Sequence, residues 1–318
     1  MSENRHINSI QDLEAIQQKI AKEKEEKINQ KEILLCAGAG CIASGALEVK
    51  AALEKELKAQ GLSVPIVETG CLGPCAQGPV IIVKPENVFY ENVSKDDAAE
   101  IVASQIKEGK IVDRLVHMDE EKETFQPKVE DMDFFSGQTK IVLRNCGRID
   151  PLKIEEYIGE GGYSALAKCL DSMEGETIID EVKRSGLRGR GGGGFPTWLK
   201  WNFTYKAEGD RKYVLCNADE GDPGAFMDRS VLEGDPHSLI EGMAIGAYAV
   251  GANQGYVYVR AEYPLAVSRL SKALEQAREY GLLGKNIFGK GFDFDLEIRM
   301  GSGAFVCGEE TARINSIE

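Results

Sequence analysis

The chain has 318 residues, with 38 basic and 52 acidic side chains and a formal net charge of −14. This length predicts two folded units, and the negative charge argues against nucleic acid or anionic lipid as a partner. The longest apolar stretch, about 243–250, is too short to cross a bilayer. Because the amino terminus is charged rather than an apolar signal core, we expect a cytoplasmic protein whose eight cysteines stay reduced.

An amphipathic helix is the first predicted element, because Ile10, Leu13, Ile16 and Ile20 recur at three- and four-residue steps. It forms a helical arm over residues 1–31, which is either a docking element or an exposed charged helix.

The next segment, 32–112, alternates apolar runs with helical patterns and predicts a compact α/β domain. Strands are predicted at 32–36, 64–68, 80–83 and 88–93, and helices at about 44–60, capped by Ser44, and at 96–107. An acidic stretch without sustained periodicity follows, so we predict a linker over 113–138.

The second domain is predicted to cover 139–318 and to be a layered, Rossmann-like α/β domain. Its strands are predicted at 140–143, 213–216, 256–259 and 294–299, and its helices near 154–157, 163–172, 178–183, 238–250 and 264–280. Residues 308–318 begin a helix without a closing element, so we expect this domain to be incomplete at its carboxyl end.

Four of the cysteines form two pairs. Four residues separate Cys36 from Cys41, and three separate Cys71 from Cys75. Each pair lies on a glycine-containing turn after a predicted strand, so the thiolates of two loops can converge on one metal group. The spacing favours an iron-sulfur cluster but leaves zinc open, because one pair has a spacing typical of zinc sites and the other lies at its edge.

Residues 32–109 resemble the thioredoxin-like 2Fe-2S ferredoxins, whose ligands are a wider-spaced cysteine pair followed by a closer-spaced one. The resemblance implies that Cys36, Cys41, Cys71 and Cys75 ligate a 2Fe-2S cluster and that the domain transfers single electrons. The other cysteines show no pairing pattern and are expected in the core or in loops: Cys146, Cys169, Cys216 and Cys307.

A glycine cluster lies within Gly186–Lys200, with four consecutive glycines at 191–194. Glycines expose successive backbone N–H groups, and Pro196 suits the start of a helix whose positive end would face a phosphate. The cluster is neither an ordinary Rossmann fingerprint nor a Walker A loop, because a helical pattern precedes it and Phe195 and Pro196 follow it. A flexible loop without a ligand is the alternative.

Two polar motifs follow. The strand at 213–216 runs into Asn217-Ala-Asp219-Glu220, where polar groups could bind ribityl or sugar hydroxyls or could form only a solvated turn. Near the end of the chain, Glu309 and Glu310 open a helix, where they either cap it or face a nicotinamide or flavin.

Together, the segments 188–196, 217–220 and 307–311 occur in the order found in the FMN- and NADH-binding subunit of respiratory NADH dehydrogenase and its relatives in NAD(P)-linked hydrogenases and formate dehydrogenases. Residues 140–318 resemble this family. The resemblance implies FMN contacts at Gly189, Arg190, Gly191, Gly192, Lys200, Asn217, Asp219, Glu220, Gly221, Phe305, Gly308 and Glu309. It implies NAD(P)H contacts at Phe195, Phe203, Asp222 and Glu310, and it implies no catalytic side chain because the flavin performs the chemistry.

The chain departs from the family at one place in these motifs. Family members usually have Ser-Glu-Pro where this chain has Gly221-Asp222-Pro223, so a hydroxyl is absent and one carboxylate is a carbon shorter. A 4Fe-4S cluster is also typical of the family, but its ligands are absent from this chain.

Hydride exchange between NAD(P)H and FMN, followed by single-electron transfer to iron-sulfur clusters, is the function that the resemblance implies. A ferredoxin domain on the same chain resembles a soluble hydrogenase or formate dehydrogenase subunit, with electron bifurcation left open. Expected partners are a ferredoxin-like small subunit and the catalytic subunit of such a complex. The alternatives are a non-catalytic 2Fe-2S relay or assembly module without a working flavin site, and a zinc-stabilised nucleotide-binding protein.

Overall fold

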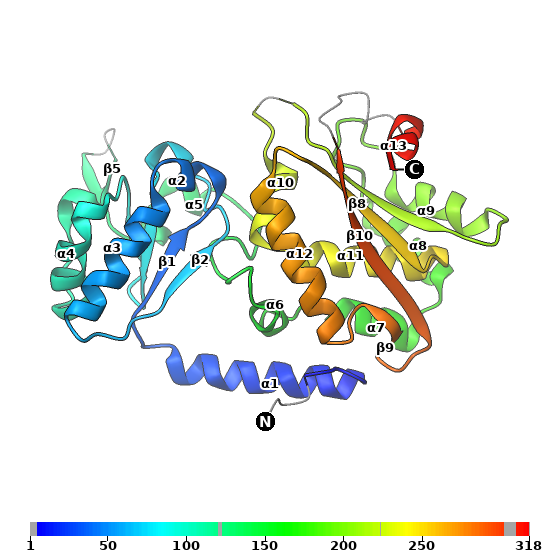
Figure 1. Ribbon diagram of the computed structural model, residues 1–318, viewed down its shortest axis with the longest axis horizontal. Coiled ribbons are helices and arrows are strands. Elements are labelled where there is room, and N and C mark those ends of the chain that lie inside the picture. Colours follow the sequence, from blue (N-terminus) through cyan, green and yellow to red (C-terminus); the bar gives the residue numbers. More distant parts are fainter. Residues whose placement is uncertain (1–4, 120–122, 223, 302–309, 318) are drawn as a thin grey trace. The chain divides into compact units, whose positions relative to one another are not determined.

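The computed structural model describes residues 5–119, 123–222, 224–301 and 310–317, and it divides into two compact α/β units (Figure 1). The cysteine unit comprises residues 21–151 and 233–235, and the glycine-loop unit comprises 1–20, 152–232 and 236–318. Residues 139–151, which we assigned to the second domain, therefore group with the cysteine unit.

A four-stranded sheet of order β2-β1-β3-β4 forms the centre of the cysteine unit. β1 is parallel to β2 and antiparallel to β3, so the helix that connects β1 to β2 must return to the opposite end of the sheet. This helix, α3, buries Val49, Leu53 and Leu57 at four-residue steps against the sheet (Figure 1). The sheet elements and the helices that follow them are β1 (Glu32–Cys36), α2 (Ala39–Ala43), α3 (Ala46–Ala59), β2 (Ile66–Thr69), η1 (Cys75–Gln77), β3 (Ile81–Lys84), β4 (Val88–Tyr90), η2 (Lys95–Asp97), α4 (Ala98–Ile101) and η3 (Val102–Lys107).

Local details of this unit differ from the sequence predictions. Ser44 ends the short helix α2 instead of capping α3, whose N-cap is Gly45 at a φ of 100°. Such a φ is accessible to glycine without steric cost, so the hydroxyl of Ser44 was a misleading cap signal.

The predicted linker is structured. Its elements are η4 (Asp113–Leu115), β5 (His117–Asp119), β6 (Thr124–Gln126), η5 (Val129–Asp131) and α5 (Asp133–Ser136). β5 and β6 pair with each other, and Leu115, Val116 and Met132 are buried in the core of the cysteine unit. Elements this short lack the hydrophobic periodicity that predicts helices and strands from a sequence, so the segment resembled a linker.

The predicted strand at 140–143 was wrong. Residues 142–148 form turns, and the side chains of Ile141 and Val142 are 72% and 51% exposed. The β-branched run suggested a strand, but a strand requires a neighbour to pair with, and no described strand pairs with this segment.

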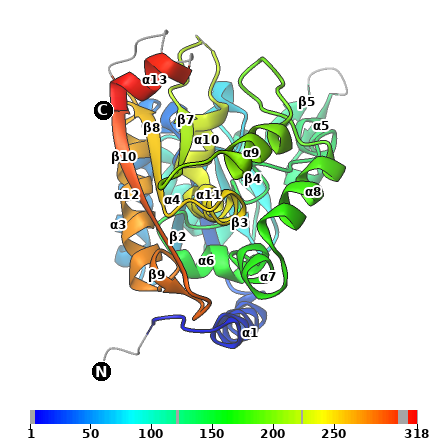
Figure 2. The same ribbon diagram turned by 90° about the vertical axis from the view of Figure 1, so that its right-hand side faces the viewer.

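The glycine-loop unit contains a second sheet, of order β7-β8-β10-β9, in which β7, β8 and β10 are parallel and β9 is antiparallel. Helix α11 packs against β7, β8 and β10, and α8, α9 and α12 pack against α11 (Figure 2). The elements are α6 (Ile154–Gly159), α7 (Ser164–Ser172), α8 (Gly175–Ser185), α9 (Thr197–Lys206), β7 (Tyr213–Ala218), α10 (Met227–Gly234), α11 (Pro236–Val250), β8 (Gln254–Arg260), α12 (Pro264–Glu279), β9 (Gly284–Ile287), β10 (Phe292–Gly301) and α13 (Glu310–Ile317).

The arm begins on the glycine-loop unit. Its helix, α1, spans Ile10–Lys27, and Ile7 and Leu13 are buried. The N–H of Ile7 donates to the carbonyl of Tyr280 at 2.8 Å, and Gln17 donates to the Ser164 hydroxyl at 2.8 Å. The first part of the arm is therefore a docking element for its own chain.

A buried polar network links α11 to α6, α7 and α12. Glu241 accepts hydrogen bonds from the Tyr157 hydroxyl at 2.5 Å and from the N–H groups of Tyr163 and Leu166. His237 is 1% exposed, with Nδ1 at 2.8 Å from the Tyr163 hydroxyl and Nε2 at 3.3 Å from Gln276 Oε1. Because Gln276 uses its amide nitrogen to donate to the Leu152 carbonyl, its oxygen must accept from Nε2, which makes His237 the neutral Nε2–H tautomer.

This burial predicts acid-sensitive folding. Burial lowers the pKa of His237 from 6.5 to about 4, so the unfolded chain binds a proton that the folded chain does not. Above pH 6.5, His237 is neutral in both states and the free energy of unfolding carries no penalty from it. As the pH falls from 6.5 towards 4, protonation of the unfolded state lowers the free energy of unfolding by up to about 3 kcal/mol. We expect His237→Gln to lose less melting temperature between pH 7 and pH 5 than the parent chain in thermal unfolding; equal losses would contradict this account.

Candidate functional site

The four paired cysteines meet at one edge of the sheet in the cysteine unit. Cys36, the last residue of β1, pairs with Thr69, the last residue of the parallel strand β2, so the loops after both strands begin at the same edge. Cys41 lies in α2 and Cys75 begins η1, and the Sγ atoms of Cys71 and Cys75 are 3.8 Å apart. The structure therefore brings together the predicted metal ligands.

Glycines permit this approach. A Cβ atom on Gly38 would lie 3.0 Å from the Cβ of Cys71, and one on Gly78 would lie 2.8 Å from the Sγ of Cys41. Any larger residue at these positions would push the two cysteine loops apart, so the loops are built for close contact between thiols.

The thiols also perturb one another. A hydrogen bond to Cys41 raises the pKa of Cys36 to about 11, and the same bond lowers the pKa of Cys41. A hydrogen bond to Cys36 raises the pKa of Cys71 as well. Crowded thiols of this kind bind metal as thiolates, with release of their protons.

A donor set of four sulfurs from two loops fits an iron-sulfur cluster. Across the described ranges, no three His, Cys, Asp or Glu side chains are arranged to hold a single metal ion. No disulfide joins any of the cysteines within the described ranges.

The glycine cluster forms a loop between α8 and α9 that is closed at its base and open at its tip. At the base, Arg188 bridges Pro196, and the N–H of Gly189 donates to the carbonyl of Phe195 at 2.9 Å. At the tip, the N–H groups of residues 191–194 have no acceptor in the described part of the chain, and a Cβ on any of these glycines would meet no atom within 4 Å. Unengaged N–H groups beside the amino end of a helix fit a phosphate.

Two exposed aromatic side chains lie at the end of this loop and in the helix α9 that follows it. Phe195 and Phe203 are 45% and 59% exposed, and Lys200 Nζ lies 5.8 Å from the centroid of the Phe195 ring. Helix α9 is fixed from its other side, where Trp201 packs against Gly246 of α11 so closely that a Cβ there would lie 3.1 Å from the ring. The helix thus holds the loop against a rigid layer and leaves flat apolar rings exposed for stacking.

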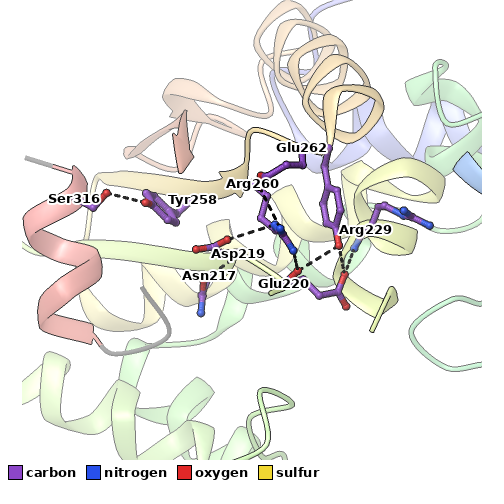
Figure 3. A network of polar contacts seen from close by, with 9 residues as sticks. Asn217, Asp219, Glu220, Arg229, Tyr258, Arg260, Glu262 and Ser316 are labelled. Carbon is purple, nitrogen blue, oxygen red and sulfur yellow. Dashed lines mark hydrogen bonds and ion pairs between the residues drawn. The ribbon is translucent and has the colours of Figure 1, made fainter. Parts of the chain in front are cut away.

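The acidic motif lies at the carboxyl end of β7. Asn217 Oδ1 accepts a hydrogen bond from the N–H of Asp219 at 3.2 Å, and this bond forms the turn that we gave as the alternative to a binding role. The Asn217 side chain is nevertheless exposed and accessible to a ligand. Asp219 lies 3.9 Å from Arg260 Nε, which is buried and has no hydrogen-bond partner among the described residues (Figure 3). Burial raises the pKa of Asp219, and the charge of Arg260 opposes this rise. A buried donor without a partner fits a site that a polar ligand completes.

Glu220 has a different environment from its neighbours, because its carboxylate is hydrogen-bonded to backbone N–H groups of the protein. It accepts from the N–H groups of Asp228 and Arg229, at 3.1 and 3.2 Å, in the first turn of α10. Its backbone carbonyl accepts from Arg260 at 2.6 Å (Figure 3). Glu220 therefore caps α10 and fixes the turn, whereas Gly221 and Asp222 are exposed.

The third motif is only partly described. Phe305, Gly308 and Glu309 lie outside the described residues, and the side chain of Glu310, the first residue of α13, is likewise not described. The helix α13 lies close to the acidic motif, because Ser316 Oγ is 2.7 Å from the Tyr258 hydroxyl (Figure 3). The charge of Arg313 also opposes the rise in the pKa of Asp219 that burial causes.

Arg260 was missed by the sequence analysis. A basic residue at the carboxyl end of β8 was a usable signal, because β8 is parallel to β7 and both strands end at the same edge. The pairing of β7 with β8 itself was not visible in the sequence.

Two family matches coincide with these sites. Residues 22–105 match the thioredoxin-like [2Fe-2S] ferredoxin family, and residues 182–318 match the Nuo51 FMN-binding domain. Both matches fall on the units that the structure describes, one on a ferredoxin-type domain and one on a flavin-type domain. Residues 182–318 thus form a Nuo51 FMN-binding domain and residues 22–105 a thioredoxin-like [2Fe-2S] ferredoxin domain, and the cofactors of these two domain types are FMN and a 2Fe-2S cluster.

Relatives of known name cover part of the chain. It is 64% identical over 181 residues to the NADP-reducing hydrogenase subunit HndC of Solidesulfovibrio fructosivorans. This alignment covers 57% of this chain and 36% of that subunit. It is 51% identical over 178 residues to the F 2 subunit of the NADH-quinone oxidoreductase of Rhizobium meliloti, covering 56% and 42%. The chain thus spans less than half the length of these two relatives.

Among solved structures, the NAD+-reducing [NiFe]-hydrogenase in the air-oxidized state aligns with a TM-score of 0.44 and 22% identity, covering 100% of this chain and 55% of that one. No helix within the described ranges is long and apolar enough to cross a membrane.

The cap on α10 gives a stability prediction. Glu220→Ala leaves two N–H groups at the start of α10 without their acceptor, so we expect the free energy of unfolding to fall by about 1–3 kcal/mol. Glu220→Gln keeps one acceptor oxygen and is expected to lose less. Glu262→Ala, which removes an exposed carboxylate close by, is the control in denaturant unfolding, and a loss as large as that of Glu220→Ala would contradict the cap.

Proposed function

We propose that this chain is the flavin-binding part of a multi-subunit oxidoreductase that exchanges hydride between NAD(P)H and FMN and passes single electrons to its 2Fe-2S cluster. The observation that carries the proposal is the presence, on one chain, of two converging thiol pairs and a loop with unengaged N–H groups at a helix start. When bound, FMN exchanges electrons in pairs with the nicotinamide and singly with the cluster.

The side chains of the glycine-loop unit bind and orient in this proposal. The N–H groups of Gly191 and Gly192 bind the FMN phosphate, with Gly189 and Arg190 beside them, and Lys200 supplies positive charge. Asn217 and Asp219 accept hydrogen bonds from ribityl hydroxyls, and Gly221 completes their turn. Phe305, Gly308 and Glu309 complete the flavin site. The proposed NAD(P)H contacts are Phe195, Phe203, Asp222 and Glu310.

Glu220 has a positioning role in this proposal, because its carboxylate is already bonded to α10. It keeps the turn at 217–222 in the shape that the flavin contacts require. No side chain acts as an acid, base or nucleophile, since binding and orientation are the contributions of the protein.

We also propose that the partners are other subunits of a hydrogenase-type complex. The similarity to HndC, a subunit of an NADP-reducing hydrogenase, supports this assignment over a respiratory one. We propose a cytoplasmic location as well, because thiolate ligation of a cluster by the two cysteine pairs requires a compartment in which cysteines stay reduced.

The test is anaerobic reconstitution of the full chain with FMN, iron and sulfide, followed by addition of NADH or NADPH. We expect the flavin absorbance to bleach with one of the two nucleotides. Cluster absorbance without bound flavin would instead indicate the relay module, and zinc without iron would indicate the nucleotide-binding alternative.

The cluster ligands can be tested separately from the flavin. Cys36→Ala removes one of four thiolate ligands, so we expect iron and acid-labile sulfide content to fall severalfold while FMN content is unchanged. Cys169→Ala, which removes a buried thiol of the glycine-loop unit, is the matched control. An equal loss of iron in both variants would exclude the proposed ligand set.

Flavin and nicotinamide contacts can be distinguished in the same way. Gly192 has a φ of 94°, so Gly192→Val distorts the loop tip and is expected to weaken FMN binding about tenfold or more. Phe195→Leu removes only a stacking ring, so we expect slower flavin reduction by the nucleotide with FMN retained. Rapid-mixing absorbance and FMN titration measure the two effects, and loss of FMN from the Phe195 variant would contradict this division.

A further inference from the structure

The segment after the predicted linker packs onto the loop that carries Cys71 and Cys75. The N–H of Gly147 donates to Thr69 Oγ1 at 2.9 Å, and this hydroxyl donates to the carbonyl of Ile149 at 3.0 Å. A Cβ on Gly147 would lie 2.2 Å from a methyl carbon of Leu72, so the contact depends on glycine. All of these residues belong to the cysteine unit.

Lys140 lies at the start of this segment and directs its ammonium group to the cysteine loop. Its Nζ donates to the carbonyl of Leu72, the residue after Cys71, at 3.2 Å. The same ammonium lies 5.3 Å from the centroid of the Phe135 ring, which limits its alternative positions. The positive charge of Lys140 is also felt by the buried thiol of Cys146, where it opposes the rise in pKa caused by burial.

The cysteine loop also packs closely against Phe134, which precedes Lys140 in the sequence. Gly73 has a φ of 116°, and a Cβ there would lie 2.9 Å from the ring of Phe134. The residues before Lys140 and those after it therefore contact the cysteine loop between Thr69 and Gly73, and Lys140 bonds to the carbonyl next to Cys71 in the sequence.

A charge in this position acts on electron transfer. A 2Fe-2S cluster bound by four thiolates is anionic, and reduction adds one more negative charge. A fixed ammonium nearby stabilises the reduced form more than the oxidised form, because the Coulomb attraction grows with the charge on the cluster. The carbonyl dipole of Leu72, once bonded to Lys140, is also compensated and no longer opposes added negative charge.

We propose that Lys140 is a positioning residue for electron transfer that raises the reduction potential of the 2Fe-2S cluster. The proposal rests on ligation of the cluster by Cys36, Cys41, Cys71 and Cys75. It makes the cluster a better acceptor for electrons from the flavin domain and a weaker donor to a low-potential partner.

A redox titration of the reconstituted full chain, followed by the electron paramagnetic resonance signal of the reduced cluster, tests this proposal. For Lys140→Gln, we expect the ratio of reduced to oxidised cluster at a fixed potential to fall roughly threefold to tenfold, where tenfold corresponds to about 59 mV for one electron. Lys140→Arg retains the charge and the donor and is expected to keep the parental midpoint.

Lys58→Gln is the matched control. Lys58 is exposed in the last turn of α3, and the parallel pairing of β1 with β2 places that end of the helix away from the edge that carries the cysteines. The same loss of one charge there is expected to leave the midpoint unchanged.

Three outcomes would overturn the proposal. They are an unchanged midpoint in Lys140→Gln with full iron and sulfide content, equal shifts in the Gln and Arg variants, and an equal shift in Lys58→Gln. Failure of the ligand assignment is distinguishable, because it appears as absence of a cluster from the parent chain.

Discussion

Parallel pairing of neighbouring strands is the constraint on which both sites depend. β1 and β2 end opposite one another at Cys36 and Thr69, so two loops distant in the sequence begin at one edge and can present four thiols to one cluster. β7 and β8 do the same in the other unit, where Asp219 follows one strand and Arg260 ends the next. In each unit the sheet sets the register, and glycines allow the loops to approach closely or to leave N–H groups open.

In this account, the cofactors and the protein side chains have different roles. In the proposed function, FMN and the 2Fe-2S cluster supply the electron transfer, whereas the side chains bind and orient them and set the local charge. Several polar groups also support the fold: Glu220 caps α10, and Glu241 and His237 join α11 to its neighbouring helices. These interactions fix the positions of α10 and α11 within the glycine-loop unit, and a cofactor site requires such support if bound rings are to keep their distance and orientation.

Much of this architecture was predictable from the sequence, because strands such as β1 and β7 are short apolar runs next to glycine or polar turns. The cysteine spacing and the glycine cluster were informative for the same reason, since each is a local pattern. The exceptions depend on distant partners. The run at 140–143 was predicted as a strand, but no strand in the described part of the chain pairs with it. The strand β9 and the helix α10 were not predicted, and the hairpin of β5 and β6 has no periodicity in its sequence. The roles of Glu220, Arg260 and Lys140 follow from contacts with residues that only the folded chain brings near.

The central claim is that one chain binds both a 2Fe-2S cluster and FMN. Quantification of iron, acid-labile sulfide, zinc and flavin in the same anaerobically purified full chain tests it most directly. The account predicts about two iron atoms, about two sulfides and about one FMN per chain, with negligible zinc. Zinc in place of iron, or a cluster without any flavin at saturating FMN, would contradict it.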